Sequence, residues 1–173
     1  QSLLGSFNCC GISSTLYVGE NTRMKLSQNF SLKELVASQT ADRHGISNQP
    51  TDEHIENLKL LCENVLQPVR DEWGVVSVSS GYRSEILSEK IGSSRKSQHC
   101  RGQAADFECH GHDNMEVFNW IVDNTEFDQG ILEFYTGDPA SGWLHFSYNE
   151  NGNRKQTLRA FRNDAGKTQY EEI

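Results

Sequence analysis

The longest regular pattern in the sequence is an apolar stripe that repeats every three or four residues over 51–69. Its members are Ile55, Leu58, Leu61, Cys62, Val65, Leu66 and Val69. Because this spacing is that of one face of an α-helix, the pattern predicts a long core helix. Pro68 is expected to bend the helix near its end, since proline lacks the backbone N–H that a helix needs.

Shorter segments rich in β-branched and aromatic residues follow this helix. We expect a buried strand over 75–78, further strands over 104–108, 130–135 and 143–148, and an added edge strand over 158–161. A second helix carries Met115, Phe118, Ile121 and Val122 on one face. Helices first and antiparallel hairpins later predict an α+β fold, with helices packed on one face of a mainly antiparallel sheet.

The two ends of the chain lack the periodicity of its centre. Residues 1–23 are rich in Ser, Gly and Asn, and we expect them to form a flexible N-terminal extension. The folded domain is expected over 24–162, with a capping pattern Ser-Leu-Lys-Glu at 31–34, and residues 163–173 are expected to form a C-terminal tail. The first segment has neither the basic start nor the apolar stretch of a signal peptide, so no secretion signal is expected in this chain.

Composition and charge disfavour several classes of protein. The 173 residues fit one domain, and no apolar stretch reaches the roughly 18 residues of a membrane span. Sixteen Lys and Arg against 24 Asp and Glu give a net charge of -8, which disfavours binding to nucleic acid or to an anionic membrane. The five cysteines include no CxxC pair, so neither a disulfide framework nor a thiolate zinc finger is indicated. The sequence indicates no oligomeric state.

Two polar residues stand where strands should be apolar. Asp106 and His145 each lie between two apolar residues of a predicted strand, and His99 lies on the loop before Asp106. A polar side chain in such a place needs a partner, which is either a hydrogen bond within the core or a shared metal ion. Two imidazoles and one carboxylate are a ligand set for catalytic zinc, with a fourth position open to water. We therefore predict one zinc ion bound by His99, Asp106 and His145.

Three segments of the chain resemble the M15 family of zinc peptidases. They are 80–84 (Ser-Gly-Tyr-Arg-Ser), 92–107 (Gly-Ser-Ser-Arg-Lys-Ser-Gln-His-Cys-Arg-Gly-Gln-Ala-Ala-Asp-Phe) and 143–147 (Trp-Leu-His-Phe-Ser). That family includes D-alanyl-D-alanine carboxypeptidases, vancomycin-resistance dipeptidases and phage endolysins that cut L-alanyl-D-glutamate bonds. The resemblance covers roughly residues 24–161 and implies a single domain of the hedgehog-like, DD-peptidase-like type.

The resemblance also implies roles for individual residues. By it, His99, Asp106 and His145 are the zinc ligands, Arg83 holds a carboxylate or carbonyl of the substrate, and Ser97 binds substrate or positions its loop. The chemistry of arginine supports its role independently, because a guanidinium is always charged and offers a planar fork to a carboxylate. A surface salt bridge for Arg83 and a loop-capping role for Ser97 are the alternatives.

The general base is less directly indicated. Many members of the family carry an acid three residues before the last histidine, but Gly142 stands at that position here. Glu133 is an acid inside an apolar strand that should pair with the strand of His145, so we assign the base to Glu133. Asp138, in the hairpin loop, is the reserve candidate, although a solvated turn aspartate is its simpler interpretation.

Three further residues have side chains that could bind metal but are interpreted as loop residues. Cys109, His110 and His112 lie where a strand gives way to a helix, so we predict no second metal site there.

Taken together, the residues and the resemblance imply a zinc peptidase that hydrolyses peptidoglycan stem peptides, of the D-alanyl-D-alanine carboxypeptidase type. An L-alanyl-D-glutamate endopeptidase of endolysin type remains open, as does a wall-binding or virion structural module that has lost turnover. The implied partner is a peptidoglycan peptide, with no nucleic acid and no membrane insertion. We expect synthesis in the cytoplasm, from a phage or bacterial gene, and action on the cell wall.

Overall fold

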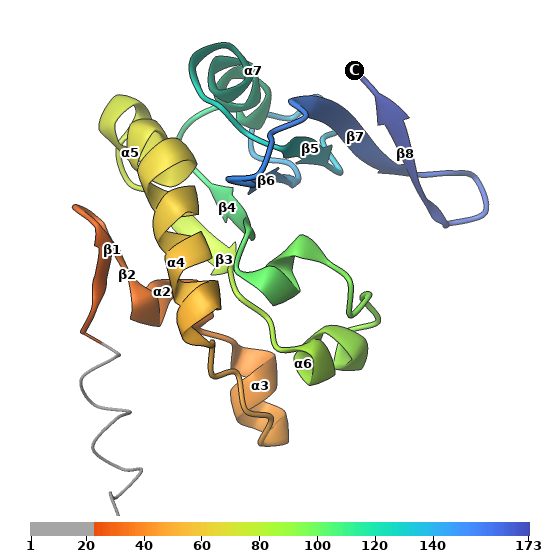
Figure 1. The fold of residues 1–173 in the computed structure, drawn as a ribbon. Coiled ribbons are helices and arrows are strands. Elements are labelled where there is room, and N and C mark those ends of the chain that lie inside the picture. The colour runs from red at the N-terminus through yellow and green to blue at the C-terminus, as the bar shows by residue number, and fades with distance from the viewer. Residues whose placement is uncertain (1–22) are drawn as a thin grey trace, which may run out of the picture.

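A computed structural model describes residues 23–173 of the chain, so the expected extension over residues 1–23 lies outside the described part except for Arg23. Figure 1 shows the elements along the chain. In order they are β1 (Lys25–Ser27), β2 (Phe30–Ser31), α2 (Leu32–Val36), α3 (Gln39–His44), α4 (Asp52–Leu61), the π-helical turn η1 (Cys62–Leu66), α5 (Gln67–Trp73), β3 (Ser77–Ser80), α6 (Glu85–Lys90), the 3₁₀ turn η2 (Gln98–Arg101), β4 (Ala104–Glu108), α7 (Asn114–Asn124), β5 (Gln129–Glu133), β6 (Trp143–Ser147), β7 (Gln156–Arg162) and β8 (Thr168–Glu172).

The predicted core helix is a continuous rod made of α4, η1 and α5 (Figure 1). All seven members of its apolar stripe are buried, at 5% exposure or less. The turn before Pro68 is widened, and the N–H of Gln67 donates to the carbonyl of Cys62, five residues back. A proline ring crowds the carbonyl four residues before it, which favours such a local widening. No helix in the described part of the chain, this rod included, combines the length and apolarity needed to cross a membrane.

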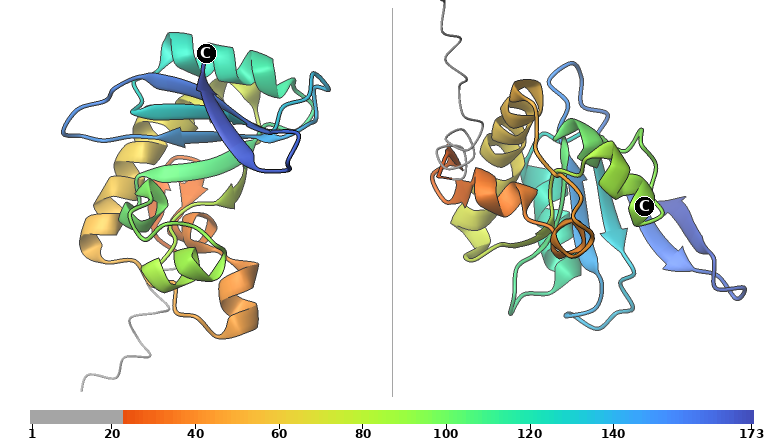
Figure 2. Two further views of the ribbon diagram at one scale, coloured as in Figure 1. Left: turned by 90° about the vertical axis from the view of Figure 1, so that its right-hand side faces the viewer. Right: turned by 90° about the horizontal axis from the view of Figure 1, so that it is seen from below.

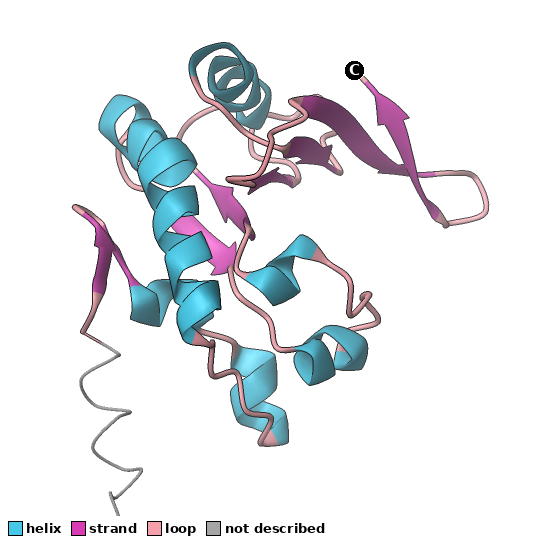
Figure 3. Cartoon of the chain, viewed as in Figure 1, coloured by secondary structure: helices cyan, strands magenta, loops and turns pink. Residues whose placement is uncertain are grey.

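The main sheet has the strand order β3-β4-β6-β5-β7-β8, and its neighbours are antiparallel except for the parallel pair β5 and β7. The rod and α7 cover one face, where Phe107 and Phe146 from the sheet meet Phe118 of α7 in the core. Figure 3 shows these helices on one side of the strands, with the β7–β8 hairpin projecting on the other. The predicted α+β fold, with helices on one face of a mainly antiparallel sheet, is confirmed.

Three expectations about strands were wrong in detail. The segment 75–78 does not form a buried strand: β3 begins at Ser77 and lies at the edge of the sheet, and Val75 is 67% exposed. The strand expected at an edge, β7, is internal, because residues 163–173 turn back and form β8 instead of a free tail. All five residues of β8 are exposed, so its sequence has no apolar alternation to indicate a strand.

The second face of the sheet carries the polar residues that the sequence singled out. Strand register sets Asp106, His145, Ile131 and Leu158 side by side in one row across β4, β6, β5 and β7. The next row runs through Trp143, Glu133, Ala160 and Tyr170. The left view of Figure 2 looks onto this face, with α4 behind the strands. Because side chains alternate along a strand, burying one set in the core places the other set here.

Gly142 closes the hairpin between β5 and β6. Its φ is +67°, and a Cβ there would lie 1.9 Å from the backbone oxygen of Glu133. Only glycine fits both the left-handed conformation and this close approach. An acidic side chain at this position is therefore excluded by the path of this backbone.

We expect Gly142→Ala to lower the free energy of unfolding by more than about 2 kcal/mol, because the new Cβ meets backbone atoms that cannot move aside. Gly137→Ala is the matched control, since Gly137 has a φ of +98° in the same loop but open space around it. It should cost about 1 kcal/mol. Denaturant unfolding of both variants measures the difference, and equal losses would contradict the close approach at Gly142.

Candidate active site

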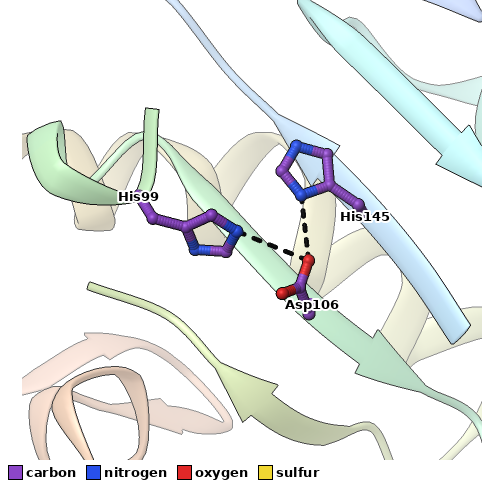
Figure 4. Close-up of side chains that lie close together, drawn as sticks. All are labelled: His99, Asp106 and His145. Atoms are coloured by element: carbon purple, nitrogen blue, oxygen red, sulfur yellow. Dashed lines mark hydrogen bonds and ion pairs between the residues drawn. The ribbon is translucent and has the colours of Figure 1, made fainter. Parts of the chain in front are cut away.

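Three predicted ligand residues meet on the second face of the sheet (Figure 4). Oδ1 of Asp106 lies 2.9 Å from Nδ1 of His145 and 3.4 Å from Nε2 of His99. One ligand atom from each residue lies within 4.8 Å of the others. Asp106 and His145 meet because they are direct partners in the register of β4 and β6, whereas His99 reaches them from η2.

The loop that carries His99 is held at several points. Nδ1 of His99 lies 2.7 Å from the carbonyl oxygen of Gly81, which can only accept a hydrogen bond, so Nδ1 carries the proton and Nε2 is free to act as a ligand. The hydroxyl of Ser97 accepts from the backbone N–H of His99 at 3.3 Å. Gly102 ends η2 with a φ of +71°, and a Cβ there would lie 2.5 Å from the backbone oxygen of His54. These contacts hold the imidazole ring of His99 in one orientation, with Nε2 toward Asp106.

The charges of these residues suit a cation. Burial alone would raise the pKa of Asp106, but His99 and His145 outweigh burial and hold that pKa well below its usual value. Burial lowers the pKa of His99, against the attraction of Asp106. The group thus offers an ionised carboxylate and a neutral imidazole, the protonation states that a metal ion requires. This donor set fits zinc, and among residues 23–173 it is the one group of three or more such side chains close enough to share an ion.

Arg83 lies directly beside the candidate ligands. Its backbone N–H donates to the carbonyl of His99 at 3.1 Å, and its Nη2 lies 3.8 Å from Oδ2 of Asp106. The side chain is 12% exposed, yet Nε is buried without a hydrogen-bond partner in the part of the chain that the structure describes. A buried guanidinium N–H without a partner is costly. Arg83 also lines the groove described below, where a substrate can reach the exposed part of its guanidinium.

Glu133 lies in the adjacent row of the same face, directly opposite Trp143 in the register of β5 and β6. It is 9% exposed. Burial raises its pKa to about 7; Asp106 adds to the rise, while His145 and Arg83 oppose it. Asp138 differs, because it is an exposed turn residue whose Oδ1 accepts from the N–H of Ala140 at 3.0 Å. The structure thus brings Glu133, but not Asp138, into the site.

A groove of about 870 Å³ joins these residues and is lined by Arg83, Ser97, His99, Asp106, Glu133 and His145 among others. The loop that includes Lys96 forms one wall, and the β7–β8 hairpin, with Arg162 and Tyr170, forms the other. The sequence does not indicate this second wall, because residues 163–173 carry no strand pattern. Nor does it indicate Asp128, a buried carboxylate that accepts hydrogen bonds from Gln98, beside His99, at 2.8 Å and from Arg154 at 2.9 Å.

The second cluster of possible ligands behaves as loop structure. The ring of His112 packs edge-on against Trp73, with the ring centroids 5.1 Å apart. Cys109 is buried, and burial raises the pKa of its thiol to about 11. A thiol that stays protonated at neutral pH is a poor metal ligand. In residues 23–173 no second group of three or more possible ligands lies close enough together to share an ion.

The α+β fold thus carries a histidine–carboxylate group that can hold a metal ion, and a comparison with protein families assigns the chain to a family. The family model of Peptidase M15 matches residues 28–137, which is more than half of the chain, so the chain belongs to the M15 peptidase family. The matched range contains Arg83, His99, Asp106 and Glu133 and ends before His145. No curated protein matches the chain.

We expect the purified chain to bind one zinc ion, and His99→Ala and His145→Ala to lose it, because each removes one of three ligands. His112→Ala is the matched control and should keep the ion. Metal analysis after gel filtration measures the content. Binding should weaken at acidic pH, since protonated imidazoles are not ligands. Unchanged zinc in both ligand variants would reject the site.

The buried carboxyl of Glu133 gives a separate prediction for the metal-free chain. A pKa that rises from 4.5 in the unfolded chain to about 7 in the fold means that the folded state holds a proton that unfolding releases. Stability therefore falls as pH rises from about 5 to 7. Because glutamine does not ionise, the Glu133→Gln variant should not lose stability over this pH range. At pH 8 its free energy of unfolding should exceed that of the wild type by on the order of 2 kcal/mol.

Denaturant unfolding at pH 5 and pH 8 measures this effect. Glu116→Gln, at an exposed position on α7, is the control and should follow the wild type. If Glu133→Gln also follows the wild type at both pH values, Glu133 is not a buried acid.

Proposed function

We propose that the chain is a zinc-dependent peptidase that hydrolyses peptidoglycan stem peptides and acts as a D-alanyl-D-alanine carboxypeptidase. The observation that carries this proposal is the position of Glu133, a buried acid with a pKa of about 7, in the same groove as the metal-binding group and Arg83. A module that only binds the wall has no need of such an acid beside a metal site.

The residues divide the chemistry between them. His99, Asp106 and His145 would hold a zinc ion, which would supply the Lewis acidity needed to polarise a peptide carbonyl and to activate water at neutral pH. Glu133 takes a proton from the attacking water and returns it to the leaving amine, which requires a pKa near the working pH. Arg83 binds the carboxylate of the terminal D-alanine and so places the last peptide bond in the site.

Two observations bear on the alternative functions. The groove continues past Glu133 to the β7–β8 hairpin, and this length favours an L-alanyl-D-glutamate endopeptidase as the second candidate, because an internal bond needs room on both sides. The glycine at position 142, where many members of the family carry an acid, is the sequence feature that favours a module without turnover. Since the hairpin requires glycine there, the missing acid reflects the backbone path and is no sign of lost activity.

The proposal is tested by incubating the zinc-loaded chain with purified peptidoglycan and with a stem pentapeptide that ends in D-alanyl-D-alanine, followed by mass spectrometry. Release of one alanine from the pentapeptide supports the carboxypeptidase. Cleavage between L-alanine and D-glutamate would instead show that the chain is an endopeptidase. Absence of any fragment in the presence of full zinc rejects both.

Glu133→Gln should fold and bind zinc but lose roughly 10²- to 10⁴-fold in rate, because glutamine keeps the shape of the side chain and cannot take the proton. Asp138→Asn is the matched control and should keep its activity, since Asp138 lies outside the groove. The rates come from the peptide assay at constant zinc content. An inactive Asp138→Asn beside an active Glu133→Gln would move the base to Asp138.

A further inference from the structure

Phe134 departs from the alternation of β5, at the point where the strand ends. Leu132 faces the core and Glu133 faces the groove, so the next side chain should face the core again. Phe134 instead has a φ of +54°, which is uncommon for a residue other than glycine. Its backbone N–H still donates to the carbonyl of Ala160 at 2.9 Å, but its side chain lines the groove. Strain of this kind persists where the surroundings impose it, and it gathers at functional sites.

The ring of Phe134 has two partners at the hairpin end of the groove. Its centroid lies 5.3 Å from that of Trp143. The second partner is Arg162, whose guanidinium carbon lies 5.3 Å from the centroid of the Phe134 ring. Nη1 of Arg162 donates to the carbonyl of Gly166, in the β7–β8 turn, at 3.2 Å. The ring and the turn thus hold the guanidinium in place, and this reduces the entropy lost when a ligand binds to it.

Arg162 has unused charge. Within residues 23–173 no carboxylate lies within 4.0 Å of its guanidinium. Arg159, on the same strand, is the contrast: its side chain lies over Phe161, forms an ion pair with Glu171 and lines a different groove. A chain with a net charge of -8 therefore keeps one free, oriented guanidinium at the far end of its candidate active-site groove.

The distance between the two arginines of the groove suggests what Arg162 binds. Arg83 contacts Asp106 on β4, whereas Arg162 lies on β7, three strands away in the sheet. Arg162 also lies four residues further along β7 than Leu158, which shares the row of Asp106. At the usual strand spacing and rise per residue the two positions are roughly 19 Å apart, the length of about six extended residues. Glu133 lies on β5, between these two positions. A peptide that reaches Arg83 with one carboxyl or carbonyl group can therefore reach Arg162 with another group several residues away.

We propose that Arg162, supported by the ring of Phe134, is a second anion-binding subsite, which binds a carboxylate of the peptide substrate remote from the bond that is cut. The proposal rests on the proposed peptidase function and adds a requirement on the substrate. The preferred peptides carry a free carboxylate on an internal residue, and blocking that carboxylate as an amide weakens binding.

Binding is measured with two uncleavable analogues of the stem peptide, one with its internal carboxylates free and one with them amidated, on the zinc-loaded full chain by calorimetry. Arg162→Ala should weaken binding of the free-carboxylate analogue roughly three- to tenfold and leave the amidated analogue unchanged. Arg159→Ala removes the same charge from the same strand and should change neither.

Equal affinity of the wild-type chain for both analogues overturns the proposal, as does an equal loss for both in Arg162→Ala. The binding measurement does not depend on the result of the peptidase assay, because the analogues bind without being cleaved. Carboxylate-dependent binding without hydrolysis of any wall peptide rejects the peptidase and keeps the subsite. Hydrolysis with binding that does not depend on Arg162 rejects the subsite alone.

Discussion

The pairing of β4 with β6 in one register is the constraint on which the candidate site depends. That register sets Asp106 opposite His145 on one face, while Phe107 and Phe146 face the core on the other. A slip of one residue would bury the two polar side chains and expose the aromatic ones. The core on the helical side therefore fixes the two candidate ligands on the groove side, so the same packing determines both the fold and the geometry of the candidate site.

A second constraint comes from the corner between β5 and β6. Gly142 lies close to the backbone oxygen of Glu133. Phe134, the residue after Glu133, has a left-handed backbone conformation. This corner fixes the backbone of the acid and turns the neighbouring ring into the groove. Because the backbone excludes a side chain at position 142, the acid that lines the groove next to the histidine–carboxylate group is Glu133, on β5.

Much of this arrangement could be predicted from local sequence, because burial leaves a strong pattern. The stripe from Ile55 to Val69 predicted the core helix, and the polar residues within apolar strands, Asp106 and His145, predicted the pair that meets in space. The family resemblance added Arg83, which lies beside them. The signals from the stripe and from the two strands are differences in polarity between a residue and its immediate neighbours in the sequence.

The features that the sequence did not indicate have no such difference in polarity from their neighbours. Strand β8 is exposed along its whole length and is specified by pairing with β7 and by a tight turn at 163–166, which local polarity does not reveal. The Phe134 ring depends on one backbone angle, and the Asp128 contacts join residues 26 to 30 positions apart. Tertiary pairing decides these features, so a pattern read along one strand cannot indicate them.

The contacts of Asp106 have a consequence for how the parts of the site depend on one another. The carboxylate oxygen Oδ1 lies 2.9 Å from Nδ1 of His145 on β6 and 3.4 Å from Nε2 of His99 on η2, and the other oxygen, Oδ2, lies 3.8 Å from Nη2 of Arg83. One carboxylate thus connects three segments that are far apart in the sequence. Any ion bound here and any group bound by Arg83 therefore act on the same side chain, so the site responds to either of them as one unit.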